Sequence, residues 1–393
     1  MMQKNNLKAI DDLMRNALGQ VFPAASLLIA RDDAILFQRV YGPENADPSH
    51  PSVTPETRFD LASLSKLFTA AAFMSLVQEG RVSVDAPVVE ALPEFGPTRF
   101  IAPVQDPISR EMAPPLAGKV GDEIDVRGVT FRHLLTHTSG LAPWRALFLN
   151  VPEPRPVLPP HLIPPERRIR RIETIFQRRE LAYPPGQRIA YSDLGLILLG
   201  QAVSRLTGQP LDVCIEQRIF APLGMSHTSY NPLARGVSRQ EIAPTEVCAW
   251  RRRRCCGEVH DENAASLAGV AGHAGLFATA RDMWLFAQSF LPGSPELLHP
   301  ALVAAMTREQ ARWGGLRRGL GWQLPGEDGA PVGQAWNKEG FGHTGFTGTS
   351  LWVDPDRRLT VILLTNRVYF GRANTAIIDF RPRLHDAILE AVS

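Results

Sequence analysis

Ser63 and Lys66, three residues apart at the head of an apolar segment, have the chemistry of a nucleophile and its base. The segment runs on to Val77 with few polar residues and ends at Glu79-Gly80. This pattern predicts a helix that is buried on most sides. Because residues three apart share one helical face, the serine hydroxyl and the lysine amine are expected to point the same way.

The predicted burial of Lys66 is what suggests a catalytic role for the pair of Ser63 and Lys66. Ser-x-x-Lys occurs by chance in many chains, but a lysine inside an apolar helix is unfavourable unless it has a partner or a task. In a water-poor site the lysine pKa can fall, and the neutral amine of Lys66 can then take the proton of the Ser63 hydroxyl. The free N–H groups of the helix N-terminus would face the oxyanion that forms.

Composition narrows the class of protein. The chain has 393 residues, of which 44% are hydrophobic, enough for one large domain or two interleaved ones. With 42 basic and 40 acidic residues, neither nucleic acid nor a membrane surface is expected as a partner. No segment reaches the ~18 apolar residues of a membrane span. The four cysteines lack zinc-site spacing and are interpreted as unpaired thiols.

The first residues, Met1 to Leu7, contain no apolar region of the kind that directs secretion. A cytoplasmic location is therefore expected, or a periplasmic one if a leader has been removed.

Strand patterns lie at both ends of the chain, with helical patterns between them. Residues 5–19 have helical spacing of apolar residues, and residues 24–30 and 34–42 have the pattern of a hairpin. Residues 351–354 and 359–365 are a second strand pair, followed by a helix expected to begin near Pro382. This order predicts an α+β fold, in which one antiparallel sheet takes strands from both ends and a helical part is inserted.

Three segments are predicted to carry no regular structure. Residues 93–129 and 151–165 are rich in proline and lack periodicity, so they are interpreted as insertions over the surface, the second as a candidate flap. The run of four arginines at 251–254 is interpreted as an exposed loop.

Several histidines could draw attention as metal or acid–base groups. His260 and His273 lack the spacing of metal ligands, so no metal is expected, and a structural or pocket-wall role is predicted. His137 is interpreted as a packed turn residue. No G-x-S-x-G motif is present, which argues against an α/β-hydrolase nucleophile elbow.

Three motifs in one order carry a family resemblance: Ser63-x-x-Lys66, Tyr191-Ser192-Asp193 and His343-Thr344-Gly345. Together they resemble the serine β-lactamase and penicillin-binding protein superfamily, in its class C-like branch. That branch includes class C β-lactamases, D-alanyl-D-alanine carboxypeptidases and family VIII carboxylesterases. Residues 59–66 look like the family's nucleophile segment almost letter for letter, and the resemblance spans about residues 10 to 392.

The resemblance implies a fold and a division into domains. A five-stranded antiparallel sheet flanked by terminal helices is expected from residues 1–60 and 270–393. Residues 61–269 would form a mostly helical domain that contains both proline-rich insertions. The site is expected between the two domains.

The resemblance also implies residue roles. Ser63 would be the acylated nucleophile, and Lys66 and Tyr191 would share the general-base role, with an accessible tyrosine phenolate. His343-Thr344-Gly345 would replace the family's K-T-G triad. The N–H of Ser63 and that of Phe346 or Thr347 would form the oxyanion hole. No cofactor is implied.

Two positions depart from the family pattern. His343 stands where K-T-G sequences have a lysine, so a fixed cation for a substrate carboxylate is lost unless the histidine is protonated. Asp193 stands where Y-x-N sequences have an amide, and we expect it to contact Lys66 and hold it as an ammonium. Tyr191 would then be the main general base.

These features predict a serine hydrolase that works through an acyl-enzyme on a small ester or amide substrate. A carboxylesterase for short to medium acyl esters is favoured. The alternatives are a D-alanyl-D-alanine carboxypeptidase or penicillin-binding protein, and a class C-like β-lactamase. A non-catalytic binder or sensor is a further alternative, although Ser63, Lys66 and Tyr191 are all present. The sequence leaves the oligomeric state open.

Overall fold

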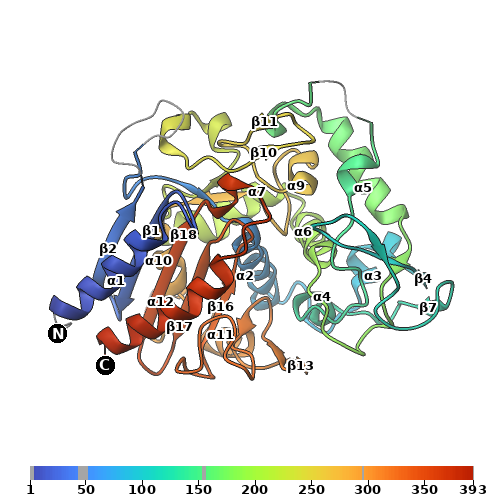
Figure 1. Cartoon of the computed structure of the whole chain (residues 1–393). Helices are drawn as coiled ribbons and strands as arrows, with labels where there is room; N and C mark the ends of the chain where they lie inside the picture. Colours follow the sequence, from blue (N-terminus) through green and yellow to red (C-terminus); the bar gives the residue numbers. More distant parts are fainter. Residues whose placement is uncertain (1–3, 43–51, 153–155, 294–295, 393) are drawn as a thin grey trace.

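Two apolar runs from opposite ends of the chain are neighbours in the central sheet. In the computed structural model, which describes residues 4–42, 52–152, 156–293 and 296–392, strand β1 (Ala25–Arg31) pairs antiparallel with β18 (Leu359–Thr365). Leu28 lies opposite Ile362. The expected pairing of strands from both ends is therefore confirmed (Figure 1).

The sheet has eight strands, so the expected number of five is wrong. Their order is β13-β14-β15-β16-β17-β18-β1-β2, antiparallel throughout. Three short strands at one edge, β13 to β15, account for the difference, because segments of two or three residues leave no periodicity to detect. The remaining bounds are β2 Ala34–Tyr41, β13 Ala311–Trp313, β14 Leu316–Arg318, β15 Gln323–Leu324, β16 Phe341–Thr344 and β17 Ser350–Asp354.

One face of the sheet is covered by the two terminal helices. Helices α1 (Lys4–Ala17) and α12 (Ile377–Val392) lie side by side there (Figure 1). The expected start of the last helix near Pro382 is wrong, since Pro382 lies inside α12. Buried Ile377 and Phe380 extend the helix toward its N-terminus, and their burial outweighs the backbone hydrogen bond that the proline lacks.

The other face of the sheet packs on α10 (Ala280–Gln288) and the nucleophile helix α2 (Ser65–Gln78). Eleven of the 14 residues of α2 are buried, which confirms a helix enclosed on most sides. At its centre the Phe68 ring stacks on Phe286 with centroids 4.1 Å apart. A short sheet of three strands leads the chain into this helix: β3 Phe59–Asp60, β12 Leu276–Ala278 and β9 Ser229–Tyr230.

The middle of the chain supplies most of the remaining helices. Among them, α6 packs on α2 and brings the Tyr191 segment to the nucleophile. The division into two domains at the expected boundaries stays a prediction. The bounds are α3 Val88–Ala91, α4 Phe131–Leu135, α5 Pro165–Gln177, α6 Asp193–Thr207, α7 Leu211–Ile215, α8 Ala221–Leu223, α9 Glu262–Ser266 and α11 Pro300–Thr307.

The proline-rich segments are more ordered than expected. Within residues 93–129, β4 (Thr98–Ile101) pairs with β7 (Glu123–Asp125) and with β8 (Glu180–Leu181), and β5 (Val104–Gln105) pairs with β6 (Met112–Ala113). Strands of two to four residues are too short to show alternation beside prolines.

The second segment and the arginine run also differ in part from expectation. Residues 153–155 lie outside the described residues, and the rest of 151–165 includes a 3₁₀ turn at Pro160–Leu162. The arginine run is part of a hairpin of β10 (Val247–Cys248) and β11 (Arg253–Arg254). Arg251 is buried because its guanidinium donates to the carbonyls of Val259 and His260. No helix in the described ranges is long and apolar enough to cross a membrane.

The aromatic packing of α2 gives a stability prediction. Replacing Phe68 by alanine removes a buried ring and leaves a cavity, so the free energy of unfolding should fall by about 3–5 kcal/mol. Urea unfolding followed by fluorescence measures this. Phe370→Ala, at a ring that is half exposed, is the control and should change little. Equal losses in both variants would contradict the central role of Phe68.

Candidate active site

Ser63 lies in a strained turn directly before α2. The turn is the 3₁₀ segment Ala62–Leu64, and Ala62 adopts a φ of +46°, which is unfavourable for a residue with a side chain. The Asp60 carboxylate stabilises this conformation by accepting the Ala62 N–H at 2.8 Å. The strain therefore sits beside the candidate nucleophile, where the surrounding contacts maintain it.

Lys66 is buried and its ammonium contacts three oxygens. The Nζ atom lies 2.8 Å from Ser63 Oγ, 2.7 Å from Asp193 Oδ1 and 3.1 Å from the carbonyl of His273. The side chain is 1% exposed. The expected contact between Asp193 and Lys66 is therefore present, and the lysine reaches the serine as its helical spacing predicts.

The charges around Lys66 favour the ammonium form. Burial lowers its pKa, but the Asp193 carboxylate and Tyr191 more than offset this effect, so the pKa lies above the usual lysine value. Burial also raises the pKa of Tyr191, and the neighbouring ammonium only partly opposes it. At rest the site thus holds an ammonium and a neutral phenol. The phenolate is less accessible than the sequence led us to expect.

His343 lies on β16 and is neutral. Burial, together with the positive charges of Arg318 and Lys66, lowers its pKa well below the usual histidine value. Its Nδ1 lies 2.8 Å from the carbonyl of Thr344, so we assign the proton to Nδ1. The buried Nε2 then presents a lone pair and has no hydrogen-bond partner among the described residues. His343 therefore does not supply the cation of a K-T-G lysine.

A cation at this place comes from Arg318, which sequence reasoning missed. It lies on β14, is 7% exposed, and its guanidinium carbon is 5.4 Å from the centre of the Tyr191 ring. Burial lowers its pKa to about 10, so it stays charged at neutral pH. Within the described ranges its Nε and Nη1 atoms have no hydrogen-bond partner. No sequence signal pointed to Arg318, because the strand that carries it has only three residues.

The loop after β16 is fastened to the nucleophile segment. The Thr347 hydroxyl donates to the carbonyl of Asp60 at 2.7 Å, and the Thr349 hydroxyl donates to that of Leu61 at 3.0 Å. Gly345 is required here, because a Cβ atom would lie 2.7 Å from the Leu61 oxygen. The backbone N–H groups of Ser63, Phe346 and Thr347 make no hydrogen bond within the described part of the chain. The predicted oxyanion donors are therefore free.

The histidines left open by the sequence occupy positions around the site. His273 Nε2 lies 2.8 Å from Asp261 Oδ1, and ligand atoms of His273, Asp261 and Asp193 lie within 4.8 Å of one another. In this cluster, the positive charge that Asp193 contacts is the ammonium of Lys66. His137 accepts the backbone N–H of Ser192 at Nδ1, so it positions the Tyr191 segment.

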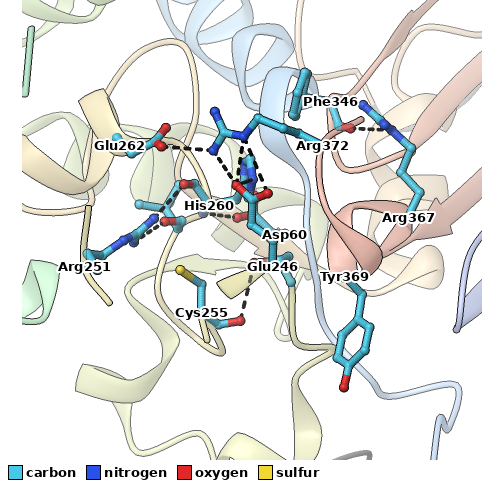
Figure 2. A network of polar contacts seen from close by, with 12 residues as sticks. Asp60, Glu246, Arg251, Cys255, His260, Glu262, Phe346, Arg367, Tyr369 and Arg372 are labelled. Atoms are coloured by element: carbon cyan, nitrogen blue, oxygen red, sulfur yellow. Dashed lines mark hydrogen bonds and ion pairs between the residues drawn. The ribbon is translucent and has the colours of Figure 1, made fainter. Parts of the chain in front are cut away.

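His260 contacts the loop between β16 and β17, residues 345–349, which we call the oxyanion loop. Its Nε2 lies 2.9 Å from a Glu246 oxygen, and its ring stacks on Phe346 with centroids 5.5 Å apart. Figure 2 shows Arg372 bridging Glu246 and Glu262 beside this pair, and the His260 backbone donating to Asp60. His260 therefore has a structural role beside the site, through its contacts with Glu246 and Phe346.

In this fold Lys66 Nζ lies 2.8 Å from Ser63 Oγ and 4.9 Å from the centre of the Tyr191 ring. The fold is that of the β-lactamase and transpeptidase-like superfamily. A protein-family model described as Beta-lactamase matches residues 10–381. The chain belongs to this family, and its active-site class is that of serine hydrolases.

Known proteins similar to this chain have several activities in their names. A putative D-alanyl-D-alanine carboxypeptidase of Salmonella schwarzengrund (strain CVM19633) is 30% identical over 401 residues, covering 94% of this chain and 85% of the relative. The solved structure of EstCE1, a hydrolase with promiscuous acyltransferase activity, superposes with a TM-score of 0.68 at 20% identity, covering 96% of this chain and 99% of EstCE1. A penicillin-binding protein from Bacillus halodurans gives a TM-score of 0.65 at 20% identity over the whole of both chains. The two structures show the fold alone, and the class C-like branch stays a prediction.

The contact between Asp193 and Lys66 generates a pH prediction. Asp193→Asn removes the carboxylate that raises the Lys66 pKa, so the ammonium should lose its proton at lower pH. If the ammonium is the working form, the alkaline limb of the rate profile shifts to lower pH, which a pH series of kcat/KM measures.

Asp282→Asn is a matched control. Asp282 is a buried carboxylate on α10 that accepts hydrogen bonds from the Thr228 hydroxyl and the His227 N–H. It should leave both limbs in place. A shift of the acid limb alone in Asp193→Asn would show that neutral Lys66 is the base, against the assignment of this role to Tyr191.

Proposed function

We propose that the protein is a carboxypeptidase that removes a C-terminal D-amino acid from an acyl-D-alanyl-D-alanine type of peptide. The reaction proceeds through an acyl-enzyme on Ser63. The observation that carries the proposal is the buried, charged guanidinium of Arg318 beside Tyr191 and His343. A fixed positive charge at this place suits the carboxylate at the end of a peptide.

The groups around Ser63 support a two-step mechanism. Ser63 Oγ attacks the scissile carbonyl while Lys66 Nζ, which lies 2.8 Å from it, takes its proton and passes one of its own to the Asp193 carboxylate at 2.7 Å. The N–H groups of Ser63 and Phe346 receive the oxyanion. The C–N bond then breaks, and the leaving amine takes a proton from the same groups. Water attacks the resulting ester, and Ser63 regains its proton.

The name of a similar protein agrees with the choice of a carboxypeptidase. The Salmonella relative, named as a putative D-alanyl-D-alanine carboxypeptidase, is similar over 94% of this chain. One of the grounds for preferring an esterase was the loss of the K-T-G lysine, and Arg318 on β14 offers a charge in its place.

Carboxylesterase activity on short to medium acyl esters is the second candidate. It is favoured by the neutral His343, whose free Nε2 is an acceptor and repels a carboxylate placed directly on β16. An ester without charge needs only the nucleophile and the oxyanion donors.

One comparison of substrates tests the proposal. Purified protein is assayed on a diacetyl-lysyl-D-alanyl-D-alanine peptide, on p-nitrophenyl butyrate and on nitrocefin, with Ser63→Ala as control. Release of D-alanine that is lost in Ser63→Ala is the expected result. Ester turnover without peptide turnover would replace the proposal by the esterase, and dominant nitrocefin turnover by a β-lactamase. If wild type neither turns over nor acylates Ser63, the protein is a binder.

Arg318 gives a separate prediction. Arg318→Met should lower kcat/KM for the free-carboxylate peptide about 10- to 100-fold, because a charge-assisted pair with the substrate is lost. The same peptide with an amidated C-terminus is the internal control, and its kcat/KM should change much less. Arg318→Lys should recover part of the loss. An equal change for both peptides would contradict the carboxylate-binding role.

A further inference from the structure

Two buried arginines donate hydrogen bonds to backbone carbonyls of the oxyanion loop. Arg381 comes from the terminal helix α12, and Arg367 from the 3₁₀ turn Arg367–Phe370 that follows β18. Both residues are 6% exposed. Neither forms an ion pair with a carboxylate in the described part of the chain. Buried cations without such partners are unfavourable, so other polar groups must stabilise these two guanidinium groups.

Arg381 is directed at the peptide group that carries the candidate oxyanion donor. Its Nη2 donates to the carbonyl of Gly345 at 3.2 Å and to that of Thr349 at 2.9 Å. The Gly345 carbonyl also accepts the N–H of Gly348 at 3.0 Å. In a trans peptide the C=O and the next N–H point in opposite directions, and the bond from Gly345 to Phe346 is trans. The contacts on the Gly345 oxygen therefore fix the direction of the Phe346 N–H.

Arg367 holds the next peptide group along the loop. Its Nε donates to the carbonyl of Phe346 at 2.8 Å, as Figure 2 shows, and its guanidinium lies over the Phe346 ring at 4.8 Å. The His260 ring packs on the same phenylalanine at 5.5 Å. The ring of Phe346 is thus fixed by two side chains and its carbonyl by a charged donor.

A charge on a carbonyl oxygen changes what its amide can do. The cation draws electron density toward the oxygen and makes the N–H of the same peptide group a stronger donor. In a site of low dielectric the positive potential also extends to the place where negative charge develops. The carbonyl of Gly345 and the N–H of Phe346 belong to one peptide group, so Arg381 acts on this donor directly.

We propose that Arg381, with Arg367 beside it, positions and polarises the Gly345–Phe346 peptide group as the oxyanion donor of the acyl-transfer reaction. Arg381 is a positioning residue that touches no substrate. The inference depends on the proposed function only in that Ser63 is acylated, and it does not depend on which substrate is natural.

The test distinguishes the effect of the Arg381 charge from the structural support that its hydrogen bonds give to the oxyanion loop. Arg381→Met removes the donor and the charge, Arg381→Gln keeps an amide donor without charge, and Arg381→Lys restores a cation. Two rates are measured for each folded variant: steady-state turnover of p-nitrophenyl butyrate, and second-order labelling of Ser63 by a fluorophosphonate. The affinity of a boronic acid, which places a tetrahedral group on Ser63, is a third reading.

Arg99→Met is the matched control. Arg99 is a buried arginine on β4 that likewise donates to carbonyls, those of Phe95 at 2.9 Å and Arg178 at 2.7 Å, away from the site. Its replacement should destabilise the fold while kcat of the folded protein stays within about twofold.

The expected result is a fall in kcat of about 10- to 100-fold in Arg381→Met and Arg381→Gln, below the loss for a direct oxyanion donor. KM should change less than about threefold, and the labelling rate and boronic acid affinity should fall in parallel. Arg381→Lys should recover most of kcat. If Arg381→Met does not fold, the measurements on Arg381→Gln decide the test.

Two failures are distinguishable. If wild type is not labelled at Ser63, the proposed function itself is wrong. If wild type is labelled and folded Arg381→Gln is labelled and turns over at the same rate, the role of Arg381 is overturned. A loss of kcat equal to that in Arg99→Met would also overturn it.

Discussion

The burial of one ammonium group determines how the rest of the site is arranged. Lys66 is enclosed by α2 and can remain charged only because Asp193, Ser63 and the His273 carbonyl surround it. Each partner comes from a different segment: the nucleophile turn, the start of α6 and the turn before β12. A buried charge tolerates little displacement of its partners, since an unpaired charge in a low dielectric is strongly unfavourable. The electrostatic requirement of Lys66 therefore holds these three segments in one arrangement.

Much of the fold followed from the sequence because its signals are local or strongly periodic. The hairpin of β1 and β2, the strands β17 and β18 and the buried helix α2 each have enough residues to show a pattern. The short strands β4 to β7 and β13 to β15 do not, and their pairing is decided by contacts between distant segments. The start of α12 was misplaced because burial of Ile377 and Phe380 overrides the usual position of a proline.

The site shows the same division between local and distant information. The spacing of Ser63 and Lys66 and the acid at Asp193 predicted contacts that the structure contains. Arg318, Arg367 and Arg381 could not be found in this way. Nothing in their neighbouring residues distinguishes them from surface arginines, and only tertiary packing removes them from water. Positive charge around the site is thus spread over residues far apart in the chain, while the local K-T-G position holds a neutral histidine.

The pairing of β1 with β18 has a consequence for the order of events during synthesis. The nucleophile segment leaves the ribosome early. Phe346 of the oxyanion loop is made 283 residues after Ser63, and Arg381 of α12 is made 318 residues after it. A nascent chain thus contains Ser63 and Lys66 long before it contains the oxyanion loop. Because both segments must be made before they can meet, the oxyanion loop can join Ser63 only after the strand β16 that precedes the loop has been made.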